Sequence, residues 1–211
     1  VILCAVTKHR SIADVEVLLN RGPRIKNLAE NRWPDCEEKF RYFAGAKFSG
    51  IKKHFIGPLQ SNKVRKVLPL VDSIQSVDSL KLLSRINKVA TELDKKIEFC
   101  FQVNISQDQL KQGIAPDQLS EIIKGYLDGK EKGELEQVQL VGLMTIGAQT
   151  NLEKRQEYFQ KFHQLFTHIN QDFFPNEPLK ILSMGMSEDY QLAIDCGSSM
   201  VRLGRVLFED I

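Results

Sequence analysis

The chain begins Val1-Ile2-Leu3-Cys4-Ala5-Val6-Thr7-Lys8. Residues 1–6 are apolar without interruption, whereas a strand with one face in water alternates apolar and polar side chains. An uninterrupted run of this length is typical of a parallel strand that is covered on both faces. The stretch therefore predicts a parallel sheet, with Lys8 at the carboxyl end of its first strand.

Short apolar runs recur along the chain and alternate with segments of helical period, although the second run, residues 24–29, is less apolar than the first. The strands are expected at residues 1–6, 24–29, 53–56, 73–77, 98–103, 138–143, 179–183 and 200–203. Helices are expected between them, for example at residues 31–43, 59–67 and 153–170. Ser11 and Asp78 are expected to be helix N-caps, and residues 128–136 a solvated loop.

This alternation over residues 1–211, without a linker, predicts a single domain of the α/β class. The preferred architecture is a closed (β/α)8 TIM barrel, although 211 residues is fewer than the roughly 250 that are typical of that fold. A doubly wound open parallel sheet is the alternative.

Composition excludes several classes of protein. A hydrophobic fraction of 42% excludes a disordered chain, and no apolar run approaches the roughly 18 residues of a transmembrane helix. The 29 basic and 27 acidic residues leave a net charge of +2, which gives no broad footprint for nucleic acid. The four cysteines are far apart and have no histidine at metal-ligand spacing, so we expect no disulfide, no metal site and a cytoplasmic location.

In either α/β fold, ligands bind beyond the carboxyl ends of the strands. The polar residues expected there are Lys8, Asn31, Gln60, Asn104, Thr145, Ser187 and Arg202. Lys8 closes an all-apolar strand, and a partly desolvated lysine loses proton affinity, so its neutral amine becomes able to attack a carbonyl. The alternative for Lys8 is a rim lysine that reaches water or a carboxylate.

Two turns rich in glycine and serine follow the last two expected strands. They are Ser183-Met184-Gly185-Met186-Ser187 and Gly197-Ser198-Ser199-Met200-Val201-Arg202-Leu203-Gly204-Arg205. Free backbone N–H groups, a serine hydroxyl and a helix N-terminus suit a phosphate dianion, and these two loops are the usual phosphate site of a TIM barrel. Ordinary turn glycines and a helix-capping serine are the alternative.

Longer motifs extend this pattern: Ala5-Val6-Thr7-Lys8, Ala29-Glu30-Asn31-Arg32, His54-Phe55-Ile56-Gly57-Pro58-Leu59-Gln60-Ser61-Asn62-Lys63, Lys111-Gln112-Gly113, Gly142-Leu143-Met144-Thr145, Leu182-Ser183-Met184-Gly185-Met186-Ser187 and Val201-Arg202-Leu203-Gly204. Together they resemble the pyridoxal phosphate homeostasis proteins over nearly the whole chain. The chain departs from that family's pattern at Ala29, where glycine is usual, and at Arg205, where threonine is common. The family's leading helix and an initiator methionine are absent, so we expect that a leading segment has been lost.

The resemblance implies a barrel like the N-terminal domain of alanine racemase, with pyridoxal 5′-phosphate as the cofactor, held as a Schiff base on Lys8. It implies that Ser187 and the backbone N–H groups of Gly204 and Arg205 hold the phosphate. It also implies that Arg202 faces the pyridine nitrogen and that Asn31 lines the edge of the cofactor. No residue is assigned a catalytic role and none a metal.

The resemblance implies a protein of intracellular cofactor homeostasis, which buffers or delivers pyridoxal phosphate without robust catalysis. A cationic guanidinium at the pyridine nitrogen makes the ring a poor electron sink, although racemases of the related fold also use an arginine there. The chain ends at residues 208–211, without the second domain of those racemases. We therefore expect a monomer whose partners are the cofactor and apo forms of cofactor-dependent enzymes, with no nucleic acid and no membrane.

Two alternatives remain at this point. The first is a pyridoxal-phosphate-dependent amino-acid racemase or lyase that consists of the barrel alone. The second is a binder of sugar phosphates or nucleic acid that uses the local basic cluster of Lys47, Lys52, Lys53, Lys63, Arg65 and Lys66.

Overall fold

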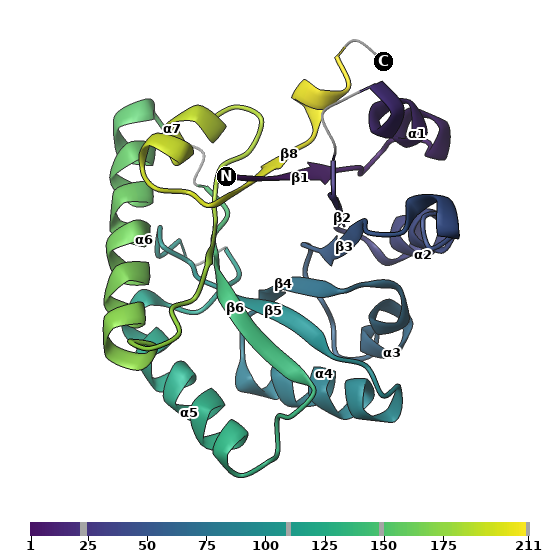
Figure 1. Ribbon diagram of the computed structural model, residues 1–211. Coiled ribbons are helices and arrows are strands. Elements are labelled where there is room, and N and C mark those ends of the chain that lie inside the picture. The colour runs from purple at the N-terminus through teal and green to yellow at the C-terminus, as the bar shows by residue number, and fades with distance from the viewer. Residues whose placement is uncertain (22–24, 109–110, 148–149, 210–211) are drawn as a thin grey trace.

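β1 (Ile2–Val6) pairs in parallel with a strand on each side, and this double pairing closes a barrel. The computed structural model describes residues 1–21, 25–108, 111–147 and 150–209. Over these residues the strands follow the order β1 to β8 around a closed barrel, every neighbouring pair is parallel, and the helices lie outside (Figure 1). The predicted (β/α)8 barrel is confirmed, and the open doubly wound sheet is wrong.

The remaining strands lie close to the predicted ranges. They are β2 (Asn27–Glu30), β3 (Lys52–Phe55), β4 (Ser73–Val77), β5 (Ile97–Gln102), β6 (Val138–Met144), β7 (Ile181–Ser183) and β8 (Met200–Leu203). Arg24, with which the second strand was expected to begin, lies outside the described residues. Ala29 occupies a regular position in β2, opposite His54 of β3, so the departure from the family's glycine leaves the strand intact.

The helices between these strands vary widely in length. They are α1 (Ile12–Arg21), α2 (Trp33–Tyr42), α3 (Val64–Val67), α4 (Leu80–Glu92), α5 (Leu119–Glu131), α6 (Leu152–Phe173) and α7 (Tyr190–Asp195). Short 3₁₀ turns cover Ala46–Phe48, Leu68–Leu70, Pro116–Gln118 and Arg205–Leu207. The helix expected at residues 59–67 is therefore reduced to a single α-helical turn, followed by a 3₁₀ turn.

Two local expectations are corrected. α4 is capped by Ser79 and not by Asp78: the Ser79 hydroxyl accepts the backbone N–H of Leu82 at 3.3 Å. The expected loop at residues 128–136 is wrong in its first part, because α5 continues to Glu131. Gly129 is buried within that helix, where an added Cβ would lie 2.7 Å from Leu135 Cδ1. Glycine at residue 129 therefore allows Leu135 to pack closely against the helix and does not mark a turn. The Ser11 cap is confirmed, since its hydroxyl accepts the N–H of Asp14 at 3.1 Å.

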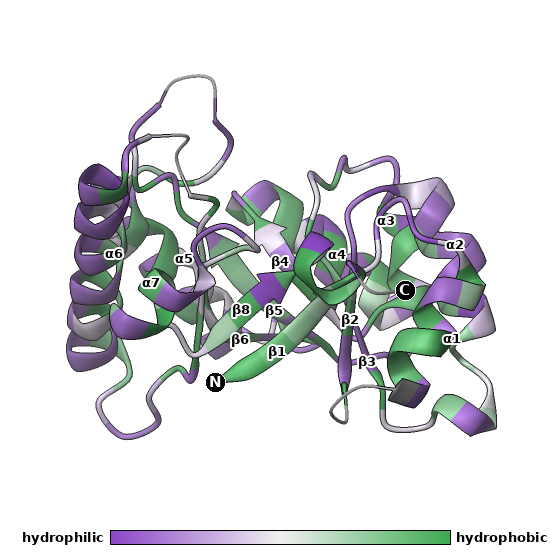
Figure 2. Cartoon of the chain, turned by 90° about the horizontal axis from the view of Figure 1, so that it is seen from above, coloured by the Kyte–Doolittle hydropathy of each residue, from purple (hydrophilic) through white to green (hydrophobic). Residues whose placement is uncertain are grey.

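The core has two parts, which differ in polarity. A large apolar cluster fills the space between the barrel and the helices; Figure 2 shows β1 in the green of apolar residues, whereas α6 turns many hydrophilic residues outward. A small cluster of Cys4, Val6, Ala29 and Met200 is separate from it. Cys4 alternates along β1 with Ala5 of the outer cluster, so the small cluster lies inside the barrel, where buried polar side chains accompany it.

His54 is one of these interior polar residues and is 2% exposed. Burial, followed by the nearby Lys52 cation, lowers the pKa of the His54 imidazole to about 3. Because the pKa of His54 in the folded protein lies below the ordinary histidine value of 6.5, the unfolded chain binds the proton more readily. The stability that His54 contributes is therefore complete above pH 6.5 and is lost progressively as the pH falls toward 3.

We expect His54→Gln to remove this pH dependence. Between pH 7 and pH 5, protonation of His54 in the unfolded chain should lower the free energy of unfolding of the unaltered protein by about 2 kcal/mol. The variant should not show this decrease. Urea unfolding at both pH values measures the difference. His168→Gln, on the exposed side of α6, is the matched control and should retain the parental pH dependence. An equal pH dependence in His54→Gln and the parent would contradict the buried, neutral imidazole.

Candidate functional site

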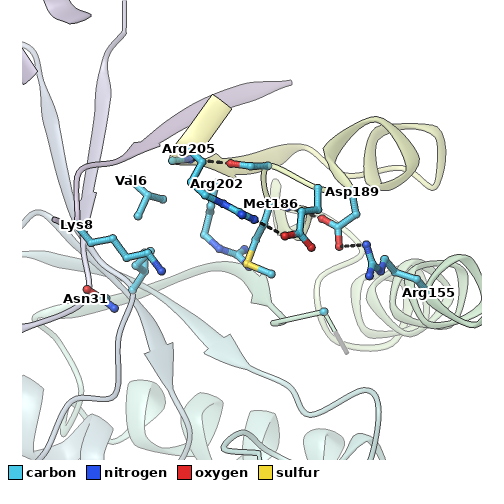
Figure 3. Close-up of a pocket in the computed structure, with 13 residues that line it drawn as sticks. Val6, Lys8, Asn31, Arg155, Met186, Asp189, Arg202 and Arg205 are labelled. Atoms are coloured by element: carbon cyan, nitrogen blue, oxygen red, sulfur yellow. Dashed lines mark hydrogen bonds and ion pairs between the residues drawn. The ribbon is translucent and has the colours of Figure 1, made fainter. Parts of the chain in front are cut away.

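A pocket of about 350 Å³ opens at the carboxyl ends of the barrel strands. It is lined by Val6, Lys8, Asn31, Ile56, Gly147, Arg155, Met186, Ser187, Glu188, Asp189, Arg202, Gly204 and Arg205. All six residues that the sequence assigned to cofactor binding are among them. Figure 3 shows Lys8 and Asn31 on one side of the pocket and Arg202, Arg205 and Asp189 on the other.

Lys8 lies two residues after the end of β1, and hydrogen bonds hold the backbone on both sides of it. The Thr7 N–H donates to Ala29 O at 3.0 Å, and the Arg10 N–H donates back to Thr7 O at 3.1 Å, which closes a tight turn around Lys8 and His9. His9 takes the left-handed conformation, with φ of 62°. The Lys8 side chain is exposed, so the expected partial desolvation is wrong for the protein without a ligand.

A buried ion pair lies behind this turn, between β2 and α2. Lys39 Nζ donates to Glu30 Oε1 at 2.7 Å and to the carbonyl of Thr7 at 2.6 Å, and the Thr7 hydroxyl donates to the same Glu30 oxygen. The side chains of Lys39 and Glu30 are 6% and 0% exposed. The pair therefore fixes the backbone next to Lys8. No sequence motif pointed to it.

Asn31 is held where β2 ends. The Ile56 N–H donates to Glu30 O at 2.9 Å, and Gly57 approaches so closely that an added Cβ would lie 2.0 Å from Asn31 O. Only glycine fits at residue 57. Asn31 Oδ1 is buried and has no hydrogen-bond partner among the described residues. A free acceptor of this kind in a pocket wall is a group that a bound ligand can satisfy.

The turns after β7 and β8 meet, as the sequence pattern predicted. The Gly204 N–H donates to Ser187 Oγ at 3.2 Å, and the Arg202 N–H donates to Gly185 O at 3.0 Å. Gly185 has φ of 97°, and an added Cβ there would lie 2.6 Å from Ala193 Cβ, so the turn requires glycine. Serine hydroxyl and backbone N–H thus converge on one edge of the pocket, which is the arrangement that holds phosphate.

The Arg205 side chain does not add a free charge to this edge. Its guanidinium forms an ion pair with Glu188, which also lines the pocket, and the two side chains are 72% and 64% exposed. Only the backbone N–H of Arg205, at the start of the Arg205–Leu207 turn, remains as the expected donor.

Arg202 is a buried cation, 4% exposed. Its Nη1 donates to Ser183 Oγ at 2.6 Å and its Nη2 to Thr145 O at 2.7 Å, and both acceptors are neutral. Burial lowers the pKa of the guanidinium from its ordinary value. Arginine still remains charged in proteins, so the pocket contains a fixed positive charge.

The sequence missed Arg155 and Asp189. Arg155, from α6, places Nη1 3.5 Å from Asp189 Oδ2, and Asp189 Oδ1 accepts the Met186 N–H at 2.6 Å. This pair ties α6 to the turn that carries Ser187. Neither residue belongs to a pattern with an established chemistry, so nothing in the sequence marked them.

Other expected residues fall outside the pocket. Asn104 Nδ2 donates to the carbonyls of Asp108 and Lys111, the Thr145 hydroxyl donates to Val103 O, and Gln60 is exposed. Within the described residues there is no cluster of three or more histidine, cysteine or acidic residues that could hold a metal ion. No helix within the same ranges is long and apolar enough to cross a membrane.

The basic cluster is largely neutralised. Lys47 pairs with Glu16, Lys52 with Glu98, Lys53 with Asp72 and Arg65 with Glu92. Lys66 Nζ lies 5.7 Å from the centroid of the Trp33 ring. These partners disfavour a binding surface for polyanions at this rim.

Comparison with known proteins first defines the class. Residues 4–210 match the family model described as alanine racemase, N-terminal domain. Among solved structures, alanine racemase of Clostridium difficile 630 has a TM-score of 0.74 at 18% identity, over 98% of this chain and 54% of that one, which supports the fold alone. The chain is thus a barrel of the alanine racemase N-terminal class.

More similar relatives identify the family within this class. The pyridoxal phosphate homeostasis protein of Pasteurella multocida is 35% identical over 98% of this chain and 84% of its own length. The pyridoxal phosphate homeostasis protein of Synechocystis is 38% identical over 99% of this chain and 90% of its own length. The structure of PipY from Synechococcus elongatus with pyridoxal phosphate bound has a TM-score of 0.82 at 30% identity, over 99% of this chain and 92% of that one. The chain belongs to the family of pyridoxal phosphate homeostasis proteins.

The buried ion pair behind Lys8 generates a stability prediction. Lys39→Met leaves the Glu30 carboxylate buried without its cation, and we expect a loss of about 3–5 kcal/mol in the free energy of unfolding. The double variant Glu30→Gln/Lys39→Met should recover most of this loss, because no uncompensated charge remains.

Urea unfolding measures both changes. Arg41→Met is the matched control: it breaks the exposed Arg41–Glu37 pair on the same helix and should cost about 0.5 kcal/mol or less. Equal losses from Lys39→Met and Arg41→Met would show that the buried pair does not stabilise the fold.

Proposed function

We propose that this protein binds pyridoxal 5′-phosphate in the pocket and serves cofactor homeostasis by holding and releasing it. One observation carries the proposal: the Lys8 amine and the Ser187–Gly204 edge line the same pocket. The first supplies the amine that an aldehyde needs, and the second supplies the donors that a phosphate needs. Similarity to PipY with pyridoxal phosphate bound supports the same ligand.

The residues fit the cofactor at two places, its aldehyde and its phosphate. When bound, pyridoxal phosphate supplies an aldehyde that condenses with a primary amine to give a Schiff base and water. Lys8 would provide that amine from the end of β1. The Ser187 hydroxyl and the backbone N–H groups of Gly204 and Arg205 would hold the phosphate, and Asn31 would contact the edge of the ring.

Arg202 fits a holding role, although it does not by itself separate holding from catalysis, because racemases of the related fold also use an arginine there. Its fixed positive charge would face the pyridine nitrogen and disfavour a proton there. An unprotonated ring withdraws electrons weakly and stabilises a carbanion poorly. The absence of robust catalysis is therefore part of the proposal, and the racemase or lyase reading is its alternative.

The proposal includes a cellular setting. We infer a cytoplasmic protein, because Cys4, Cys36, Cys100 and Cys196 are free thiols, and free cysteines without disulfides are typical of proteins in reducing compartments. Its recipients would be apo forms of enzymes that use pyridoxal phosphate. A monomer, one domain over residues 1–211, without nucleic acid or membrane partners, completes the proposal.

We expect the purified protein, after incubation with pyridoxal phosphate and reduction with borohydride, to carry one pyridoxyl group on Lys8. Intact-mass and peptide mass spectrometry measure this. Lys8→Ala should carry none, because Lys8 supplies the one amine among the described residues that line the pocket. Lys180→Ala, which alters an exposed lysine at the opposite end of the barrel next to β7, should label like the parent. Undiminished labelling of Lys8→Ala would overturn the assignment.

The alternative function has its own test. We expect no isomerisation and no exchange of the α-proton when the loaded protein is incubated with D- or L-amino acids in deuterated water. Proton NMR of the amino acids measures exchange, with the same cofactor free in solution as the baseline. Exchange by the protein well above this baseline would favour the racemase or lyase.

A further inference from the structure

A continuous series of buried hydrogen bonds crosses the interior of the barrel. Arg202 Nη1 lies 2.6 Å from Ser183 Oγ, and Ser183 Oγ lies 2.8 Å from Gln75 Oε1. Gln75 Nε2 lies 3.2 Å from His54 Nδ1, and His54 Nε2 lies 3.0 Å from Asn27 Oδ1. The five residues come from β8, β7, β4, β3 and β2, and we call them the interior network.

Each hydrogen bond in the network has a defined donor and acceptor, beginning with the guanidinium of Arg202. Arginine donates and never accepts, so Ser183 Oγ accepts from Arg202, and the Ser183 hydroxyl donates its own proton to Gln75 Oε1. The amide nitrogen of Gln75 then faces His54 and donates to Nδ1. The His54 proton is therefore on Nε2, from which it donates to Asn27 Oδ1.

Burial makes this order strict. Arg202, Gln75 and His54 are 4%, 1% and 2% exposed, and Ser183 is fully buried. A reversed bond would leave a donor facing a donor away from water, and such a group costs the full desolvation penalty. A neutral imidazole is required as well, since a charged one would point Nδ1–H at the Gln75 amide. Burial, with the Lys52 cation nearby, keeps the His54 pKa at about 3 and so meets this requirement.

The network anchors the guanidinium at one edge. With Nη1 held by Ser183 and Nη2 by Thr145 O, two of the five N–H donors are used and the plane of the group is set. Arg202 also lines the pocket, so its free donors are those available to a ligand. Among the described residues, no acidic side chain accepts a hydrogen bond from Arg202.

We propose that Ser183 and Gln75 are positioning residues for Arg202, which orient its guanidinium toward the pyridine nitrogen of the bound cofactor and hold the whole network in a single proton arrangement. This role rests on the proposed function, because it needs the cofactor in the pocket. The network also determines the tautomer of His54 when no cofactor is bound. Arg202 does not contact His54, but the hydrogen bonds through Ser183 and Gln75 keep the His54 proton on Nε2.

The first experiment uses the protein without cofactor. Long-range ¹H–¹⁵N NMR of the histidine rings should place the His54 proton on Nε2, with no titration between pH 5 and pH 8. In Gln75→Glu the side chain offers only acceptors to His54, so the proton should move to Nδ1. An Nδ1–H tautomer in the parent, or an unchanged tautomer in Gln75→Glu, would overturn the proton order.

The second experiment uses the loaded protein. Ser183→Ala frees one end of the guanidinium, and we expect a shift of the cofactor's absorption band, a changed pH profile of that band and a dissociation constant raised about tenfold. Ser198→Ala is the matched control. The Ser198 hydroxyl is also buried, with the carbonyls of Leu182, Met184 and Met200 within reach of its single proton at 3.2, 2.8 and 3.0 Å. Among the described residues it forms no hydrogen bond with Arg202.

The two serine variants separate positioning from stability. Both should lower the melting temperature, but only Ser183→Ala should change the spectrum and its pH profile. If the parent takes up the cofactor and Ser183→Ala has the parental spectrum, pH profile and affinity, the positioning role is wrong while the proposed function stands. If the parent takes up no cofactor, the proposed function and the positioning role fail together, and the NMR result alone decides the proton order.

Discussion

The whole arrangement depends on one buried positive charge, the guanidinium of Arg202. A charge removed from water is costly unless hydrogen bonds replace its hydration. Here the replacement comes from the neutral oxygens of Ser183 on β7 and of Thr145 just after β6, and from a network that reaches β2. The interior of this barrel accordingly contains a row of polar side chains, whereas the layer between the barrel and the helices is mostly apolar, with the Glu30–Lys39 pair as an exception.

Two supports of different kinds position the walls of the pocket. On the side of β1 and β2, the Glu30–Lys39 pair and the close approach of Gly57 hold the backbone around Lys8 and Asn31. On the side of β7 and β8, the conformation of Gly185 and the hydrogen bond between Gly204 and Ser187 shape the phosphate edge. The walls are therefore rigid, while the Lys8 side chain that they carry remains exposed.

The sequence predicted what depends on topology. Parallel strands covered on both faces leave uninterrupted apolar runs, and their carboxyl ends must meet, so Lys8, Ser187 and Gly204 could be assigned to one site. It did not predict what depends on side-chain packing. Gln75 lies in the middle of a fully buried strand, Glu30 and Lys39 are nine residues apart with no motif between them, and Gly129 resembles a turn although it packs against Leu135.

The exposure of Lys8 has a consequence for how such a protein would retain its cargo. The proposed Schiff base on Lys8 would form with release of water and would be reversed by water, so the covalent bond alone would not trap the ligand. The fraction of protein with bound cofactor would then follow the concentration of free cofactor by mass action. Noncovalent binding of the phosphate would set the concentration at which the protein becomes saturated. Such a protein would release bound cofactor whenever the concentration of free cofactor falls, without a separate regulatory signal.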